Sequence, residues 1–459
     1  VFSLSPDQGS LRQWCIQRGL LDPHQPRALH GSVWSGTFAI ELEHEAQRLI
    51  SSAAQPHPGD DDRLDLCHLA TYTLDDAGTR EIDDAVSLDV QNGEVWIWVH
   101  IADPARLISP GSPLDQEARR RATSLYLADG VLPMLPLGLA AGPLSLRAGQ
   151  RTAAISVSVR LDSAGAIAER RIARSWVQPR YGLTYADGDE LIELAPPGDE
   201  TLADLSELMQ LRSRWRRQQG ALMFDRMEGR FRRSDGALSL QLVEPSPARL
   251  MVSEAMLLMG AVVAEFGCQH ELALPFRSQP PAELPSQAEL DQLPEGPARD
   301  AAIKRCLSRG VQGTQPMAHF SLGLSAYVQA TSPIRRYADL ASHRQIIAQL
   351  ENTTPLSEPE MGELIDDLDD PLRQSIQISR EDQRHWQQVW FSQYRDQRWD
   401  AEFLRFLRPQ DGLALVHLAD LAMDVVGRVD QGNPNPGDRM TMTVKLADPD
   451  RGELQLQLT

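Results

Sequence analysis

The order in which strand-like and helix-like segments follow one another constrains the fold of this chain most. Past residue 66, short segments rich in Val, Ile, Thr and aromatic residues alternate with turn residues, which is the pattern of β-strands. The expected strands cover residues 69–75, 83–90, 94–103, 152–162 and 166–177. Helical periodicity then dominates, at residues 201–219, 253–266, 333–350 and 358–396. A stretch that begins with sheet and ends with helices predicts one large α+β domain of mixed sheet and helices.

Both ends of the chain differ from this central stretch. The last part contains five short strand-like segments separated by Gly and Asp-Pro turns, which fits a five-stranded OB-type barrel. The first part reads as a small helical unit, with Ser10 capping one helix and a second helix starting at about Thr37. A helix-turn-helix or winged-helix module is the structure we expect there. The predicted domains are therefore residues 1–66, 67–396 and 397–459.

The charge balance limits how this chain can meet a nucleic acid. With 45 basic and 64 acidic residues, the net charge is −19, which argues against a broad basic binding surface. An internal channel, however, needs only local positive charge. Residues 211–233 hold eight Arg against Asp225 and Glu228, with Phe224 among them. Arginines interleaved with an aromatic ring suit a channel for a single strand, and a solvated amphipathic helix is the alternative.

The cysteines and the apolar runs bear on the compartment. The four cysteines are scattered and form no CxxC pair, which argues against a zinc site or a disulfide framework. The longest apolar runs, such as residues 256–266, look too short to cross a bilayer, and no basic segment leads into an apolar one near the start. We expect a cytoplasmic protein without a membrane partner.

Five carboxylates crowd into one short segment, residues 73–85. A strand ends with Asp75, the chain turns through Gly78, and Glu81, Asp83 and Asp84 precede the next strand. Such crowding costs several kcal/mol unless a cation is present. Hard oxygen ligands suit Mg²⁺ or Mn²⁺. The alternative is an ordinary solvated acidic loop.

A second segment, residues 330–340, supplies positive charge. Ser332 is suited to cap a helix whose first residue is Pro333. Free backbone N–H groups and the dipole of such a helix start would attract an anion. Arg335 and Arg336 would lie in the first turn, where one of them can bind a phosphate. The alternative is a well-capped surface helix with two solvated arginines.

Together the two segments resemble the ribonuclease II (RNB) family. The acidic segment is similar to the family's Thr-hydrophobic-Asp triplet with its clustered Asp-Ile-Asp-Asp, and the Thr-Ser-Pro-Ile-Arg-Arg-Tyr-Ala-Asp run matches the second signature without a gap. The resemblance covers roughly residues 63–395, and the tail looks like the S1-type domain that follows in the family. Further matches are His100-Ile-Ala-Asp103, Gly111-Ser-Pro-Leu-Asp115, Ser124-Leu-Tyr126, Pro133-Met-Leu-Pro136, Leu144-Ser-Leu146, His319-Phe-Ser-Leu-Gly-Leu324 and His343-Arg344.

The resemblance implies a role for each matching residue. The Mg²⁺ ligands, with Mn²⁺ as a substitute, would be Asp75, Glu81, Asp83 and Asp84. The residues implied in catalysis are Asp83, Asp84, Arg335 and Tyr185, with Arg335 on the scissile phosphate. Tyr126 and Phe224 would stack on bases, and Tyr185 and Glu254 would line the terminal nucleotide and recognise its ribose.

Ordinary structural roles are the alternatives for this substrate-binding group. Tyr126, Tyr185 and Phe224 can each be core aromatics. Glu254 opens a helix that is apolar on almost every face, so it needs a partner or a function, or else favours the helix dipole from the first turn.

The implied activity is 3′→5′ processive hydrolysis of single-stranded RNA to nucleoside 5′-monophosphates, by a monomer. Two other functions stay open. One is a catalytically silent RNA-binding scaffold, against which the Asp83–Asp84 pair and Arg335 argue; the other is a single-strand nuclease that also cuts DNA.

The sequence departs from the family pattern in four places. Glu81 stands where the family usually has Asp, Gln329 replaces a common His, and Pro143 replaces a common Cys. Typical bacterial relatives also carry two cold-shock domains at the front, where this chain has a short helical unit.

Overall fold

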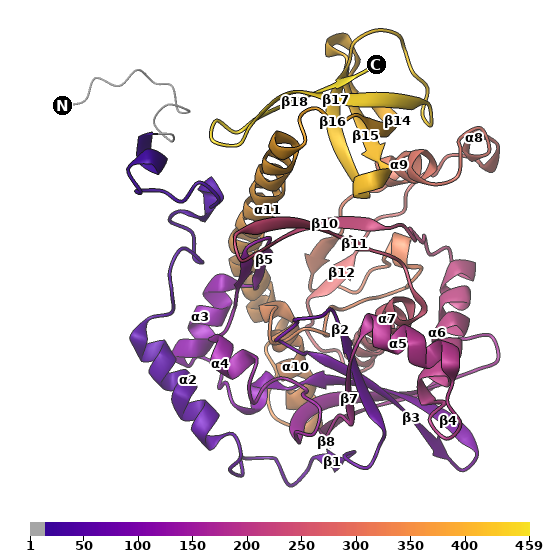
Figure 1. Cartoon of the computed structure of the whole chain (residues 1–459). Helices are drawn as coiled ribbons and strands as arrows, with labels where there is room; N and C mark the ends of the chain where they lie inside the picture. The colour runs from indigo at the N-terminus through magenta and orange to yellow at the C-terminus, as the bar shows by residue number, and fades with distance from the viewer. Residues whose placement is uncertain (1–13) are drawn as a thin grey trace.

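A seven-stranded mixed sheet forms the centre of the computed structural model, which describes residues 14–459 (Figure 1). The strand order is β1-β8-β7-β4-β3-β2-β9; the inner strands pair antiparallel, while β1 and β9 pair in parallel at the two edges. The strands are β1 Leu64–Asp65, β2 Thr71–Asp75, β3 Asp84–Gln91, β4 Glu94–Ala102, β7 Thr152–Leu161, β8 Ile167–Val177 and β9 Tyr181–Thr184. The five strands expected in this stretch are confirmed.

Alternating side chains on the strands build a hydrophobic core on each face of the sheet. In β4, Ile97, Val99 and Ile101 belong to one core, whereas Trp96 and Trp98 belong to the other. Successive side chains of a strand point to opposite faces, so an almost continuous apolar run serves a sheet that is buried on both sides. The α+β prediction is therefore confirmed.

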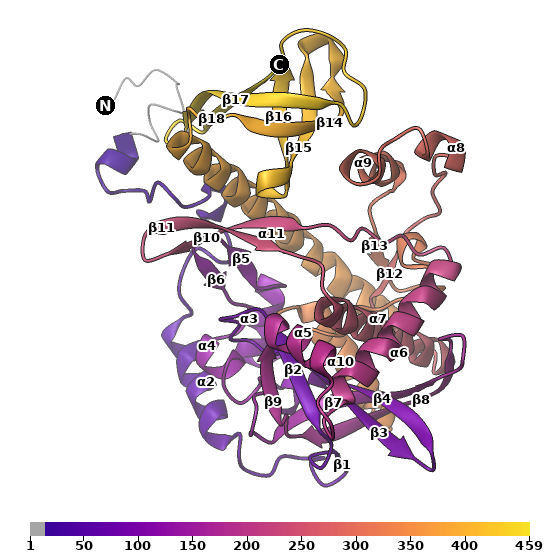
Figure 2. The ribbon, with the colours of Figure 1, turned by 45° about the vertical axis from the view of Figure 1, so that its right-hand side comes forward.

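Helices cover both faces of the sheet (Figures 1 and 2). Residues of α6 and α7 fill one core, and residues of α3, α10 and α11 fill much of the other. The helices are α2 Ile40–Ser52, α3 Pro113–Arg121, α4 Leu137–Ala140, α5 Tyr185–Leu194, α6 Thr201–Gln218, α7 Pro247–Gln269, α8 Gln287–Leu290, α9 Pro297–Cys306, α10 Tyr337–Leu350 and α11 Glu358–Gln393.

Helix α7 corrects one expectation from the sequence. Its 23 residues are long and apolar enough, by length and composition, to cross a membrane, so the apolar stretch is longer than the run we expected. Within the fold, 67% of the apolar window is buried. The helix packs against the central sheet as a core helix, through residues such as Met251, Leu258 and Val262.

The tail forms a closed five-stranded barrel in the order β14-β15-β16-β18-β17, as the sequence predicts. Its strands are β14 Trp399–Arg408, β15 Leu413–Leu418, β16 Met423–Val429, β17 Arg439–Asp448 and β18 Glu453–Leu458. The 36-residue helix α11 runs from the region of the sheet to this barrel (Figure 2). Trp386 and Phe391 of α11 share a core with the barrel, which fixes the barrel to the central domain.

Three two-stranded sheets complete the fold. The hairpin of β10 and β11 lies between the barrel and the central sheet in both views (Figures 1 and 2). Gly229 in β10 donates its N–H to the carbonyl of Ala422 at the barrel, which ties the hairpin to it. The strands are β5 Leu125–Leu127 with β6 Gly130–Leu132, β10 Glu228–Ser234 with β11 Ala237–Val243, and β12 Phe276–Ser278 with β13 Val311–Gly313.

The N-terminal part is anchored along the side of the central domain. Trp34 is almost fully buried and donates its indole N–H to the carbonyl of Thr123 at 2.9 Å. The second expected helix is confirmed as α2, starting at Ile40 rather than at Thr37. Ser10 and Leu11, expected in the first helix, lie outside the described residues, and a helix-turn-helix or winged-helix module stays a prediction.

Candidate active site

The acidic segment connects two strands of the central sheet. Asp75 is the last residue of β2 and Asp84 is the first residue of β3. These two strands pair only through Thr71 and Tyr72 of β2, opposite Ser87 and Val86 of β3. The chain between the paired parts therefore forms a loop that carries Glu81 and Asp83. The carboxylates therefore gather at one end of the sheet, where strand ends fix Asp75 and Asp84.

The structure buries Glu81 and Asp83 and half-buries Asp75 and Asp84, and it raises the pKa values of these carboxylates. Burial, together with the charge of Asp83, raises the pKa of Asp75 to about 6 against the opposing effect of Arg335. Burial and the neighbouring Asp75 raise the pKa of Asp84 to about 7. Burial also raises the pKa of Glu81. Desolvation and like charges both disfavour ionised carboxylates, so these four side chains are not those of an ordinary solvated acidic loop.

Asp83 joins the acidic loop to the second predicted segment. Its Oδ2 accepts from Arg335 Nε at 2.7 Å, and its Oδ1 accepts from the backbone N–H of Ile334 at 3.0 Å. Asp83 and the neighbouring acids raise the pKa of Arg335 above its ordinary value, which outweighs burial. The Arg335 side chain is 39% exposed, and the other N–H groups of its guanidinium donate to no residue in the part of the chain described here. Those donors are free to bind an anion.

The predicted helix start at Pro333 is wrong. Residues 332–336 form a turn, and α10 begins at Tyr337 with Arg336 at the N-cap. The backbone N–H groups of Thr331 and Ser332 donate to Oδ2 of Asp339. A Ser332 cap would need the N–H groups of Ile334 and Arg335, but these donate to Oδ1 of Asp83 and to the backbone carbonyl of Ser332, so the Ser332 side chain caps no helix. Arg335 lies in the turn and not in a first helical turn.

Tyr126 lies beside the acidic loop. Its hydroxyl donates to Oε2 of Glu81 at 2.9 Å, while 45% of the residue is exposed. The backbone of the neighbouring Ser124 donates to the carbonyl of Arg335 at 2.9 Å, which ties this segment to the turn. The structure thus brings Tyr126 together with Glu81 and Arg335, and it leaves part of the ring open for stacking.

Tyr185 reaches the same place from the edge strand β9. Thr184 pairs with Asp75 across β2 and β9, and it caps α5 through a capping box with Asp187. Tyr185 follows directly, and burial and the charges of Asp84 and Asp75 raise the pKa of its hydroxyl. The sheet register therefore brings Tyr185 to the acidic cluster.

The remaining two predicted residues lie in other surroundings. The ring of Phe224 is half-buried, with Lys304 Nζ 4.6 Å from its centroid. Glu254 is only 1% exposed, and both of its oxygens accept from Arg216. Because α7 begins at Pro247, Glu254 is not in its first turn, and the dipole explanation is wrong. Its contact with a ribose stays a prediction.

Sequence reasoning missed several residues that organise this site. Arg249 stacks on the ring of Tyr185 with its guanidinium carbon 4.1 Å from the centroid, and it pairs with Asp76 at 2.5 Å. Asp339 holds the turn and also pairs with Arg336. The acid three residues after Arg336 was a visible cue for that ion pair, whereas nothing local in the sequence linked Arg249 with Asp76.

The chemistry of the free oxygens fits a hard divalent cation. The carboxylates of Asp75 and Asp84 accept no hydrogen bond from any described residue, and Oε1 of Glu81 is buried without a partner. Among residues 14–459, no group of three or more Asp, Glu, His or Cys is arranged to hold a metal as it stands. Mg²⁺ commonly uses one or two carboxylates together with water and phosphate oxygens. Asp75 and Asp84 meet that requirement, and the four-ligand set stays a prediction.

Comparison with known proteins finds similarity to one protein family and to ribonucleases along most of the chain. The model of the RNB domain matches residues 63–352. An uncharacterized ribonuclease of Synechocystis is 39% identical over 445 residues, covering 96% of this chain and 66% of the relative. The chloroplastic/mitochondrial ribonuclease II of Arabidopsis thaliana is 37% identical over 84% of this chain and 49% of its own length. The chain thus spans from about half to about two thirds of the length of these relatives.

A solved structure shares the fold at lower sequence identity. RNase R of Mycoplasma genitalium, in complex with ribose-methylated single-stranded RNA, superposes with a TM-score of 0.80 at 18% identity. The match covers 92% of this chain and 76% of that one, so the arrangement of central sheet, helices and barrel is common to both.

Proposed function

The chain belongs to the RNB family, and from this premise we propose that it is a metal-dependent exoribonuclease. The proposed reaction is 3′→5′ processive hydrolysis of single-stranded RNA to nucleoside 5′-monophosphates. The ion pair between Asp83 and Arg335 carries the proposal. It holds a guanidinium with free N–H donors beside the carboxylates of the acidic loop. Structural likeness alone would support only the fold.

In this proposal Asp75 and Asp84 hold Mg²⁺, with Glu81 and Asp83 as further oxygen donors. The bound ion would lower the pKa of a water molecule and offset the charge of a phosphate. Asp83 orients Arg335, and the free N–H groups of Arg335 bind the scissile phosphate and stabilise its developing charge. Repulsion between Asp75 and Asp84 supports this assignment, because a cation would relieve it.

The aromatic residues hold the RNA in this proposal. The exposed part of the Tyr126 ring stacks on a base near the 3′ end, and its hydroxyl positions Glu81. Phe224 stacks on a further base, with Lys304 nearby to meet the backbone. Tyr185 lines the terminal nucleotide. Stacking of this kind accepts any base, which suits an enzyme that degrades RNA without regard to sequence.

The test is a time course on 5′-labelled single-stranded RNA with Mg²⁺ and with EDTA. The wild-type protein should shorten the RNA from its 3′ end only with Mg²⁺, and a matched DNA strand should stay intact. Asp83→Asn should remove most turnover while RNA affinity stays near normal. Asp89→Asn, a change of the same kind farther along β3, is the control and should cleave normally. RNA binding without cleavage would instead identify a silent scaffold.

A further inference from the structure

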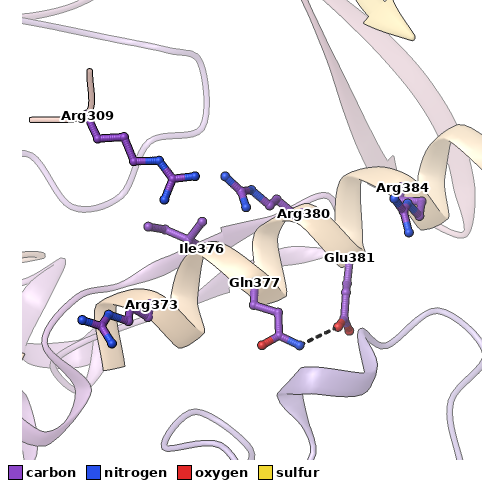
Figure 3. A pocket seen from close by; sticks show the side chains of 7 residues that line it. All are labelled: Arg309, Arg373, Ile376, Gln377, Arg380, Glu381 and Arg384. Atoms are coloured by element: carbon purple, nitrogen blue, oxygen red, sulfur yellow. Dashed lines mark hydrogen bonds between the residues drawn. The ribbon is translucent and has the colours of Figure 1, made fainter. Parts of the chain in front are cut away.

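A groove on α11, far along the chain from the acidic loop, is lined by an unusual number of arginines. It has a volume of about 450 Å³, and its lining includes Arg309, Arg373, Arg380 and Arg384 with a single acidic residue, Glu381. Figure 3 shows that all of these except Arg309 come from α11, and that the guanidinium groups of Arg309 and Arg380 point toward one another. Arg309 comes from the segment between α9 and β13.

The positive charge of this groove is largely unbalanced. Arg373 pairs with Asp369, whereas Arg309, Arg380 and Arg384 form no ion pair with any residue of the chain from position 14 onward. Both oxygens of Glu381 are engaged, one by the backbone N–H of Ala28 at 2.9 Å and the other by Gln377 at 3.0 Å. Like charges held close together repel, so the groove is suited to an anion.

The shape of the groove favours a chain of anionic groups over a single one. Residues 373, 380 and 384 share one side of α11, and at 1.5 Å per residue they span about 16 Å of helix. Arg384 also lines a second groove of about 680 Å³, where α11 meets the barrel. That groove contains Arg428 and Lys445, with Asp424 as its acidic residue, and the remaining polar lining is mostly Gln.

We propose that these two grooves form a continuous track for the phosphodiester backbone of single-stranded RNA, upstream of the nucleotides in the active site. The proposal rests on the exoribonuclease function above. Guanidinium groups bind phosphate oxygens in pairs without reading bases, so the track holds RNA of any sequence. The track also explains how a protein with a net charge of −19 can bind RNA, because its positive charge is concentrated along one path.

The track predicts that affinity depends on RNA length. Binding is measured by fluorescence anisotropy in EDTA, with oligonucleotides of about 5 and about 25 nucleotides. The wild-type protein should bind the long RNA at least tenfold more tightly than the short one. The variant Arg309→Ala/Arg380→Ala/Arg384→Ala should lose most of that difference. The slope of log affinity against log salt should become shallower by about 2, since each lost phosphate contact removes about 0.7.

A matched control removes the same charge elsewhere. The variant Arg151→Ala/Arg160→Ala/Arg170→Ala replaces three arginines whose ion pairs involve neither α11 nor the barrel, and it should keep the length dependence. Thermal unfolding checks that both variants fold.

Three results would overturn the track. In the first, the groove variant binds long RNA as the control variant does. In the second, wild-type protein binds long and short RNA equally while still degrading the short one, which leaves the proposed function intact. In the third, a polyglutamate peptide competes for the groove more strongly than RNA, which would point to an acidic protein partner.

Discussion

Arg335 donates its Nε to Oδ2 of Asp83 at 2.7 Å, although the two residues are 252 positions apart in the sequence. This ion pair joins the acidic loop between β2 and β3 to the turn that precedes α10. Asp83 is almost fully buried, and Ile334 donates a second hydrogen bond to it. The arginine is thereby oriented by a residue that a substrate does not need to touch.

Replacing Arg335 should separate this orienting role from folding. Arg335→Lys keeps the charge but loses the planar fork, and we expect kcat to fall about 10²–10³-fold, the loss typical of removing one oriented donor. Arg335→Ala also leaves the carboxylate of Asp83 buried without a cation, so the unfolding temperature of this variant should fall as well. Adding Asp83→Asn to Arg335→Ala should restore the unfolding temperature but not turnover. Normal turnover of Arg335→Lys would contradict the proposed phosphate contact.

Metal should stabilise the folded protein through Asp84. In wild type, Mg²⁺ at about 100 times its dissociation constant should raise the free energy of unfolding by about 2.7 kcal/mol. Asp84→Asn removes a ligand and also relieves the repulsion with Asp75, so this variant should respond to Mg²⁺ much less. Thermal unfolding with Mg²⁺ and with EDTA measures both effects. An equal Mg²⁺ shift in the two proteins would remove Asp84 from the ligand set.

Tyr126 should contribute to RNA affinity through its ring and to the site through its hydroxyl. Tyr126→Phe keeps the ring and loses the hydrogen bond to Glu81, so RNA affinity in EDTA should stay within a few-fold of wild type. Tyr126→Ala should weaken binding by about 1–3 kcal/mol, the value of one stacked base. Equal affinities of the Phe and Ala variants for a short RNA would show that this ring does not stack.

Glu254 should contribute to stability through its buried ion pair. Glu254→Ala leaves the guanidinium of Arg216 buried and unpaired, and such a loss costs about 3–5 kcal/mol. The double variant Glu254→Gln/Arg216→Met should recover most of that free energy of unfolding in urea titrations. If Glu254 also recognises ribose, the double variant should still discriminate poorly between RNA and DNA. Unchanged discrimination would leave Glu254 with a structural role alone.

His100 should make stability depend on pH between about 6.5 and 3. Burial lowers its pKa to about 3, and its two ring nitrogens face the hydroxyls of Ser87 and Ser156 at 2.8 and 2.7 Å. The unfolded chain binds a proton below pH 6.5 and the folded chain does not, so stability falls as pH falls. Between pH 7.5 and 5.5, wild type should lose about 1.4 kcal/mol more than His100→Gln. Parallel losses in urea titrations of the two proteins would contradict this.

Local patterns in the sequence were sufficient for much of the fold and for part of the site. A nearly continuous run of strand-forming residues specified β4, and alternation specified barrel strands such as β16, because the pleat places successive side chains on opposite faces whatever the partner strand is. The crowding of Asp75, Glu81, Asp83 and Asp84 was visible as well, because acidic residues within ten positions of one another remain close in any folded chain.

Only the tertiary structure decided which groups those residues meet. The N–H groups that Ser332 would have capped, those of Ile334 and Arg335, go to Asp83 and to the backbone carbonyl of Ser332, and α10 starts at Tyr337. Glu254 meets Arg216 across two packed helices. Arg309 meets the arginines of α11 on a shared groove. The sequence shows which charged groups and hydrogen-bond donors each segment carries. Their partners lie tens to hundreds of residues away, and the packing of the sheet and helices determines which of these groups interact.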